Sequence, residues 1–201
     1  MRTALKKKLT AEEYLAIERA ADYRSEFCDG EMFAMAGGTQ QHNLIVGNLR
    51  AELRARLKGR TCRTYSENLR VQVPATGLYT YPDVIALCSP PEFSGAVQDT
   101  LLNPQLIAEV LSDKTEAYDR GQKFAQYRTI PSLLEYVLIS QREPLVECFT
   151  RQADGSWVLV VFAGMIARAR FDSVAAEVPL AEIYENVDFT AGEEPARTAG
   201  A

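Results

Sequence analysis

The chain has 201 residues, a formal net charge of −5, and 47% hydrophobic and 24% charged residues. This composition is typical of folded globular proteins and excludes an intrinsically disordered body. The acidic balance argues against a protein that coats nucleic acid by bulk electrostatics, because phosphate neutralisation requires many clustered Lys and Arg side chains. We expect one domain over residues 1–189 and a disordered tail over residues 190–201, which lacks apolar periodicity.

The sequence also bears on location and redox state. No apolar stretch approaches the roughly 20 residues of a membrane-spanning helix, and the N-terminus has no apolar segment typical of a secretory signal. We therefore expect a cytoplasmic protein with no membrane partner. The four cysteines are far apart and form no Cys-x-x-Cys pair, so we expect reduced thiols rather than a zinc site or a disulfide framework: Cys28, Cys62, Cys88 and Cys148.

Helix and hairpin signals occupy the first part of the chain. Thr10 and Glu13 fit a capping box, which predicts a helix over residues 10–21. An Asp-Gly pair between short apolar runs predicts a hairpin over residues 27–38. The strongest helix signal covers residues 42–58, where apolar residues recur at spacings of three and four and a glycine follows.

The middle of the chain predicts the central sheet. Strand-like runs separated by Pro and Gly lie at residues 69–73, 81–88 and 104–112. A helix over residues 116–128 and a buried strand over residues 133–140 follow, and the remainder predicts an antiparallel extension. The order of helix, three strands, helix and strand indicates an α/β (α+β) fold with a mixed sheet and additions at both ends.

Two carboxylates in strand-like runs are the main candidates for a site. Asp83 directly follows Pro82 at the start of its run, and Glu109 lies inside an apolar stretch. A lone carboxylate in such a strand is costly to bury unless it is compensated. Taken singly, each residue has a structural explanation that is as good as a functional one. Glu109 would be neutralised by an ion pair with a neighbouring cation, and Asp83 would end a turn. Together, on neighbouring strands, they would form a minimal site for Mg²⁺ or Mn²⁺.

The segment after Glu109 offers candidate cations. Asp119 and Lys123 are four residues apart and share a face of the predicted helix. This helix directly follows the Glu109 strand, so Lys123 could return to the end of that strand. The alternative is an ordinary ion pair within the helix, and Lys114 is the rival lysine.

Further polar residues stay ambiguous at this stage. His42, the one histidine, starts the long helix as a capping or surface group, or else as a metal ligand or proton carrier. Glu31, after the predicted hairpin turn, is equally open. A basic run is either a solvated face or a track for a phosphate backbone: Arg50, Arg54, Arg56, Lys58, Arg60 and Arg63.

Taken in order, several short motifs resemble one family. They are LTAEEYL, DGE, QHNLIVGNL, YPDV, LIAEVLS, YDRGQKFAQYR and LLEYVLI. Their order and spacing over residues 9–189 resemble the Uma2 family of the PD-(D/E)XK nuclease superfamily, whose members are similar to restriction endonucleases.

The resemblance implies a restriction-endonuclease-like core of helix-strand-strand-strand-helix-strand, bound Mg²⁺, and hydrolysis of nucleic acid, with DNA favoured over RNA. Asp83 matches the Pro-Asp acid and Glu109 the second acid. The superfamily lysine would stand two residues after Glu109, where this chain has Leu111. The resemblance therefore assigns the basic role to Lys123, with Lys114 as the alternative, and it leaves a homodimer open by analogy.

The implied reaction is in-line attack by water on a phosphodiester, with the cation held by Asp83 and Glu109 and with Lys123 positioning the water or neutralising charge. Two other functions stay open. The missing strand lysine and the acidic net charge fit a catalytically inactive module that binds nucleic acid or a protein partner. Two carboxylates also suit a glycoside hydrolase, which the lack of an aromatic sugar platform disfavours.

Overall fold

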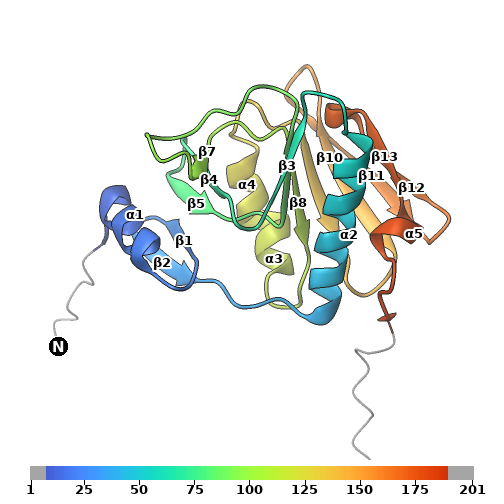
Figure 1. The fold of residues 1–201 in the computed structure, drawn as a ribbon, viewed down its shortest axis with the longest axis horizontal. Coiled ribbons are helices and arrows are strands. Elements are labelled where there is room, and N and C mark those ends of the chain that lie inside the picture. Colours follow the sequence, from blue (N-terminus) through green and yellow to red (C-terminus); the bar gives the residue numbers. More distant parts are fainter. Residues whose placement is uncertain (1–7, 190–201) are drawn as a thin grey trace, which may run out of the picture.

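The computed structural model describes residues 8–189, and the predicted tail over residues 190–201 lies outside them. Two main sheets dominate the structure (Figure 1). One has six strands in the order β11-β10-β9-β8-β6-β3, and the other has five in the order β2-β1-β5-β4-β7. None of the helices in the described part is long and apolar enough to cross a membrane.

The N-terminal helix and hairpin form as predicted. Helix α1 spans Ala11–Ala20, β1 spans Ser25–Cys28 and β2 spans Glu31–Ala34. The side chain of Thr10 accepts the backbone N–H of Glu13 at 3.1 Å, and the Glu13 carboxylate accepts the backbone N–H of Thr10 at 2.9 Å. These two bonds form the capping box and satisfy N–H groups that the first helical turn leaves free.

Helix α2 spans Gln40–Arg56 and covers one face of the six-stranded sheet (Figure 1). The Thr39 side chain caps it by accepting the backbone N–H of His42 at 3.1 Å. The rest of this layer is formed by β12 (Arg168–Phe171), the short 3₁₀ turn η2 (Asp172–Val174), β13 (Ala176–Pro179) and α5 (Leu180–Ile183).

The six-stranded sheet is mixed, as predicted, because β8 and β9 are parallel and the other neighbours are antiparallel. Ala86 and Ala108 face α2, whereas Ile85 and Ile107 belong to the core on the other face. This alternation decides which side chains of the sheet can meet. The strands are β3 (Arg63–Ser66), β6 (Val84–Leu87), β8 (Leu106–Val110), β9 (Glu135–Ile139), β10 (Leu145–Arg151) and β11 (Trp157–Ala163).

The first strand of this sheet differs from the prediction. Residues 69–73 contain β4 (Arg70–Val73), which lies in the five-stranded sheet beside β5 (Leu78–Thr80) and β7 (Thr100–Leu101). The position expected for it is taken by β3. Since β3 is an edge strand with no fully buried residue, it lacks the apolar alternation that marks a core strand in the sequence.

A helical segment lies on the face opposite α2, and its side chains join the core there. It comprises α3 (Glu116–Tyr118), the π turn η1 (Asp119–Lys123) and α4 (Phe124–Tyr127). The predicted helix over residues 116–128 is therefore present, with a wider turn in its middle.

The prediction of four reduced cysteines is wrong for one pair, since Cys62 and Cys88 form a disulfide. Strands β3 and β6 are antiparallel and pair Arg63 with Leu87, which brings the next residues outward, Cys62 and Cys88, face to face. Their separation of 26 residues hides this proximity in the sequence. Cys28 and Cys148 are free thiols, as expected.

Candidate active site

The register of β6 and β8 brings Asp83 and Glu109 together. The ladder pairs Val84 with Ala108 and Ile85 with Ile107, so continuing it by one residue places Asp83 opposite Glu109. The backbone N–H of Asp83 lies 3.4 Å from Oε2 of Glu109. Like charges directly opposite each other destabilise a sheet, so this pair requires compensation.

Glu109 is compensated by the helical segment that follows its strand. It is only 4% exposed, and its Oε1 lies 2.9 Å from Nζ of Lys123 and accepts the Tyr127 hydroxyl at 2.9 Å. Lys114, the rival lysine, is exposed in the turn before α3. The structure thus brings Lys123 to the acids and leaves Lys114 outside.

Lys123 is surrounded by carboxylates from three elements. Besides Glu109, its Nζ lies 3.2 Å from Glu26 of β1 and 3.4 Å from Asp119 of η1. Glu26 was missed in the sequence, which drew attention to Glu31 in the same hairpin. The only sequence feature that marked Glu26 was its place next to Phe27 in a short strand-like run. Glu31 is exposed on β2, opposite Cys28, and is not part of this cluster.

The π turn explains how one helical segment reaches the cluster repeatedly. In an α-helix, residues four apart are offset by about 40°, so three residues at successive spacings of four drift by about 80°. The π turn over Asp119–Lys123 holds more residues per turn, which reduces that drift. Asp119, Lys123 and Tyr127, each four residues after the last, therefore face the same site.

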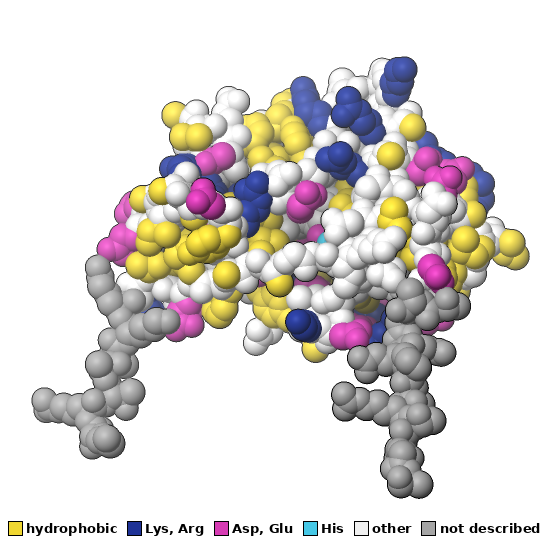
Figure 2. Space-filling view, turned by 60° about the horizontal axis from the view of Figure 1, so that its bottom comes forward, with side chains coloured by type: hydrophobic (Ala, Val, Ile, Leu, Met, Phe, Trp, Pro, Cys, Tyr) yellow, Lys and Arg dark blue, Asp and Glu magenta, His cyan; other side chains and the backbone are white. Residues whose placement is uncertain are grey.

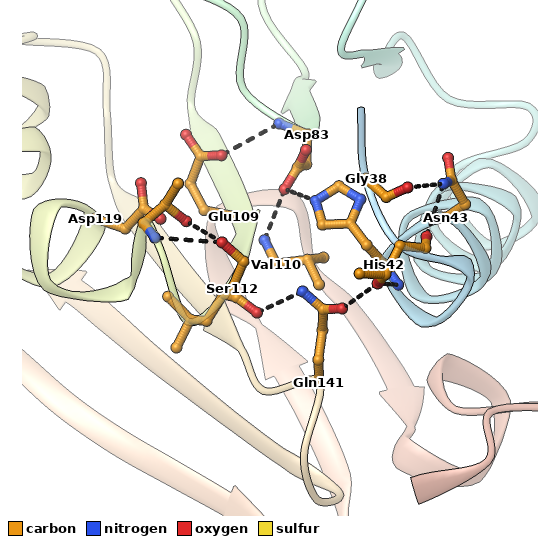
Figure 3. Close-up of polar contacts among 12 residues, drawn as sticks. Gly38, His42, Asn43, Asp83, Glu109, Val110, Ser112, Asp119 and Gln141 are labelled. Atoms are coloured by element: carbon orange, nitrogen blue, oxygen red, sulfur yellow. Dashed lines mark hydrogen bonds and ion pairs between the residues drawn. The ribbon is translucent and has the colours of Figure 1, made fainter. Parts of the chain in front are cut away.

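Asp83 is held from the other side by α2 (Figure 3). Its Oδ2 accepts the backbone N–H of Val110 at 2.8 Å and lies 3.1 Å from Nε2 of His42. Gly38 allows the histidine ring to come close, because a Cβ at Gly38 would lie 2.7 Å from Nδ1 of His42. His42, which was ambiguous in the sequence, is thus placed beside Asp83.

A second link fixes the start of α2 to the end of β8. The Thr39 hydroxyl donates to Oε1 of Gln141 at 2.6 Å, and Nε2 of Gln141 donates to the Leu111 carbonyl at 2.6 Å (Figure 3). Because Thr39 caps α2, this chain of bonds fixes the position of His42 relative to the Glu109 strand.

The cluster has an excess of negative charge. Burial raises the pKa of Glu109 to about 8, while Lys123 opposes the rise and the charge of Asp83 adds to it. Burial likewise raises the pKa of Asp119, again against the effect of Lys123. For Lys123, burial lowers the pKa, but Glu109 and other neighbours outweigh it and leave the pKa well above its usual value. Burial also lowers the pKa of His42, but the hydrogen bond and charge of Asp83 and the charges of other carboxylates together outweigh it and raise the pKa.

The donor set suits a hard divalent cation. Within residues 8–189, no three His, Cys, Asp or Glu side chains converge to hold a metal by themselves. Mg²⁺ usually binds through one or two carboxylates, with water and substrate phosphate completing its shell. Asp83 and Glu109 fit this smaller set.

The raised pKa of Glu109 predicts a stability that falls with rising pH in metal-free protein. Its folded pKa of about 8 exceeds the unfolded value of about 4.3, so the folded state binds more protons between these values. The stability due to this proton is present at low pH and is lost as pH rises through about 8. A cation bound at Glu109 would compete with this proton, so Mg²⁺ should raise the melting temperature more at pH 9 than at pH 6.

Thermal melts from pH 5 to 9, with Mg²⁺ or with a chelator, would measure this dependence. Glu31→Gln should keep the wild-type profile, and Glu109→Gln should flatten it. A melting temperature of chelated protein that rises from pH 6 to pH 9 would contradict the prediction.

A cleft of about 440 Å³ leads from the surface to Asp83 and His42. Helix α2 lines one side through Gly47 and Arg50, and the segment before β1 lines the cleft through Arg24. Figure 2 shows a hollow with the histidine colour at its base and dark blue Lys and Arg side chains along one border.

Comparison with known proteins gives the family of the chain. The family model of Uma2, described as "Putative restriction endonuclease", matches residues 11–180. Two uncharacterized proteins of Synechocystis sp. are similar over nearly their whole length: sll1609 is 38% identical over 85% of this chain and 97% of its own, and slr1290 is 32% identical over 90% and 94%.

A crystal structure shares the fold. It is that of a "putative nuclease belonging to DUF820" from Anabaena variabilis, with a TM-score of 0.70 and 20% identity, over 88% of this chain and 97% of that one. At this identity the likeness speaks for the fold alone. The family match covers most of the chain, and the similarity to the Synechocystis proteins covers 85% and 90% of it. The chain therefore belongs to the Uma2 family.

Proposed function

We propose that this protein is a metal-dependent endonuclease that hydrolyses phosphodiester bonds in nucleic acid. The observation that carries the proposal is the opposed pair of Asp83 and Glu109, with the ammonium of Lys123 at 2.9 Å from Glu109 and a cleft that opens at Asp83. Membership of a family described as "Putative restriction endonuclease" supports the class of substrate.

Asp83 and Glu109 would hold the cation, Mg²⁺ or Mn²⁺. When bound, it would stabilise charge on the phosphoryl oxygens and lower the pKa of its bound water. Lys123 favours the ionised form of Glu109 and adds positive charge behind it. His42 lines the cleft and lies 3.1 Å from Asp83, and the hydrogen bond and charge of Asp83 help to raise its pKa above the usual value. We assign to His42 the delivery of a proton to the leaving oxygen.

The alternative is a non-catalytic module that binds nucleic acid or a protein. One observation favours it: Lys123 is buried and engaged by three carboxylates, whereas the superfamily pattern places its lysine on the strand itself. The two functions differ in their need for metal, because a binding module does not require a cation held by Asp83 and Glu109.

The test is to incubate purified protein with single-stranded DNA, duplex DNA and RNA, in Mg²⁺, Mn²⁺ or chelator, and to measure metal affinity by calorimetry. We expect cleavage of at least one substrate in either metal and none in chelator. Cleavage in chelator would point to a contaminating nuclease. Inactivity on every substrate, combined with no metal binding, would overturn the proposal in favour of the binding module.

A further inference from the structure

Helix α2 carries a glycine where packing does not call for one. Gly47 lies in the interior of α2, is exposed and lines the cleft beside Asp83. Glycine weakens a helix interior relative to alanine. A Cβ built at Gly47 would have no atom within 4 Å, so no neighbour requires its absence. The absence of a side chain at Gly47 therefore leaves space in the cleft.

Positive charge flanks this opening. Arg50 follows Gly47 by three residues on α2, and Arg24 lies before β1, and both are exposed and line the cleft. In the part of the chain that the structure describes, neither arginine forms an ion pair with a carboxylate. Arg24 is positioned by Asn68, whose Oδ1 accepts from its Nη2 at 2.6 Å and from its Nε at 3.1 Å.

The cleft has separate acidic and basic parts. Asp83 and Glu67 contribute the carboxylates of its lining, and His42 lies next to Asp83. The arginines lie on the exposed border, together with Tyr23, which is 58% exposed. Two guanidinium groups and an exposed aromatic ring are the groups that hold a polynucleotide backbone and stack its bases.

The volume of the cleft selects among polynucleotides. About 440 Å³ is in the range of pockets that enclose a small molecule, and a base of an intact duplex cannot enter such a pocket without first being unpaired and unstacked. A single strand can enter one nucleotide at a time, because its bases are free to turn away from one another.

We propose that the cleft binds a single-stranded polynucleotide, with Arg24 and Arg50 on its phosphates, a base stacked on Tyr23, and Gly47 keeping the path to Asp83 open. This inference rests on the proposed function in taking nucleic acid as the substrate, and it names the strandedness of that substrate.

The test uses Gly47→Leu, which adds a side chain to the wall of the cleft and replaces glycine by a good helix former. Binding of fluorescein-labelled oligothymidylate and oligouridylate would be measured by fluorescence anisotropy in chelator, so that no strand is cut. We expect at least a tenfold loss of affinity for whichever strand binds better, with a melting temperature no lower than that of wild type. The matched control is Ala55→Leu, an exposed position of α2 outside the cleft lining, which should bind as wild type does.

A second variant tests the phosphate contacts. Arg50→Gln should weaken binding and reduce the slope of log affinity against log salt by about 0.7, the value for one lost phosphate contact on a single strand. Comparison of the two labelled strands separates DNA from RNA as the ligand.

Two results would overturn the inference: unchanged affinity in Gly47→Leu, or tighter binding of a duplex than of its single strands. Its failure is distinguishable from that of the proposed function. If wild type cleaves in a metal-dependent way and Gly47→Leu binds single strands as wild type does, the single-strand inference fails and the proposed function stands. If Gly47→Leu loses binding but wild type cleaves nothing with any metal, the proposed hydrolysis fails and the single-strand inference stands.

Discussion

Asp83→Asn is expected to lower the rate of metal-dependent cleavage by about 10² to 10³-fold and to leave the protein folded. Asparagine has nearly the shape of aspartate, and its oxygen can still accept the Val110 N–H that Asp83 Oδ2 accepts at 2.8 Å. What it lacks is the negative charge that would anchor the proposed cation, and the loss of one electrostatic group of this kind typically has an effect of that size.

Single-turnover cleavage at saturating metal, together with the metal affinity, would measure the effect of Asp83→Asn. Glu31→Gln is the matched control, because it also neutralises a carboxylate but lies on exposed β2 outside the cluster. Near wild-type rates in Asp83→Asn would show that the carboxylate is not needed for the reaction.

Lys123→Met is expected to destabilise the protein by about 3–5 kcal/mol, which is typical when one partner of a buried ion pair is removed. Methionine fills much of the same volume, but Glu109, Glu26 and Asp119 lose the ammonium that lies within 3.4 Å of each. The carboxylates can partly relieve this by binding protons, so the loss should be larger at pH 9 than at pH 6. Cleavage should be lost as well.

Urea denaturation at both pH values would measure these changes. Lys114→Met removes a lysine from an exposed turn and should change the free energy of unfolding by no more than about 0.5 kcal/mol. The double variant with Glu109→Met should recover part of the loss, because it removes the uncompensated carboxylate too. A Lys123→Met protein as stable as wild type at pH 9 would contradict this account.

Local patterns were sufficient for much of the fold. A capping box, an Asp-Gly turn and leucine periodicity each act within a few residues, and α1, the first hairpin and α2 form where these signals lie. Strand β3 is the exception, because an edge strand buries little and leaves a weak pattern. Its place in the sheet depends on pairing with β6 rather than on its own sequence.

The cluster was predictable only where its residues share a strand or a helix. Glu109 in an apolar strand and Lys123 on the next helix are linked by short chain connections. His42 and Asp83 are 41 residues apart in the chain, and Glu26 lies on β1, far in sequence from Lys123 in the π turn, so neither approach has a local signal. The π turn was also hidden, because a turn of this kind differs from an α-helix in hydrogen bonding rather than in residue pattern.

The disulfide between Cys62 and Cys88 makes the redox state of the solution an experimental variable. The bond closes a ring of chain that contains Asp83, and a cross-link between residues 26 apart contributes roughly 3.5 kcal/mol by limiting the unfolded chain. Thiol reductants in an assay buffer would remove that constraint from the strand that presents Asp83. Protein purified with reductant and protein purified without it are therefore two different reference states. Every variant should be compared with wild type that was prepared under the same redox conditions.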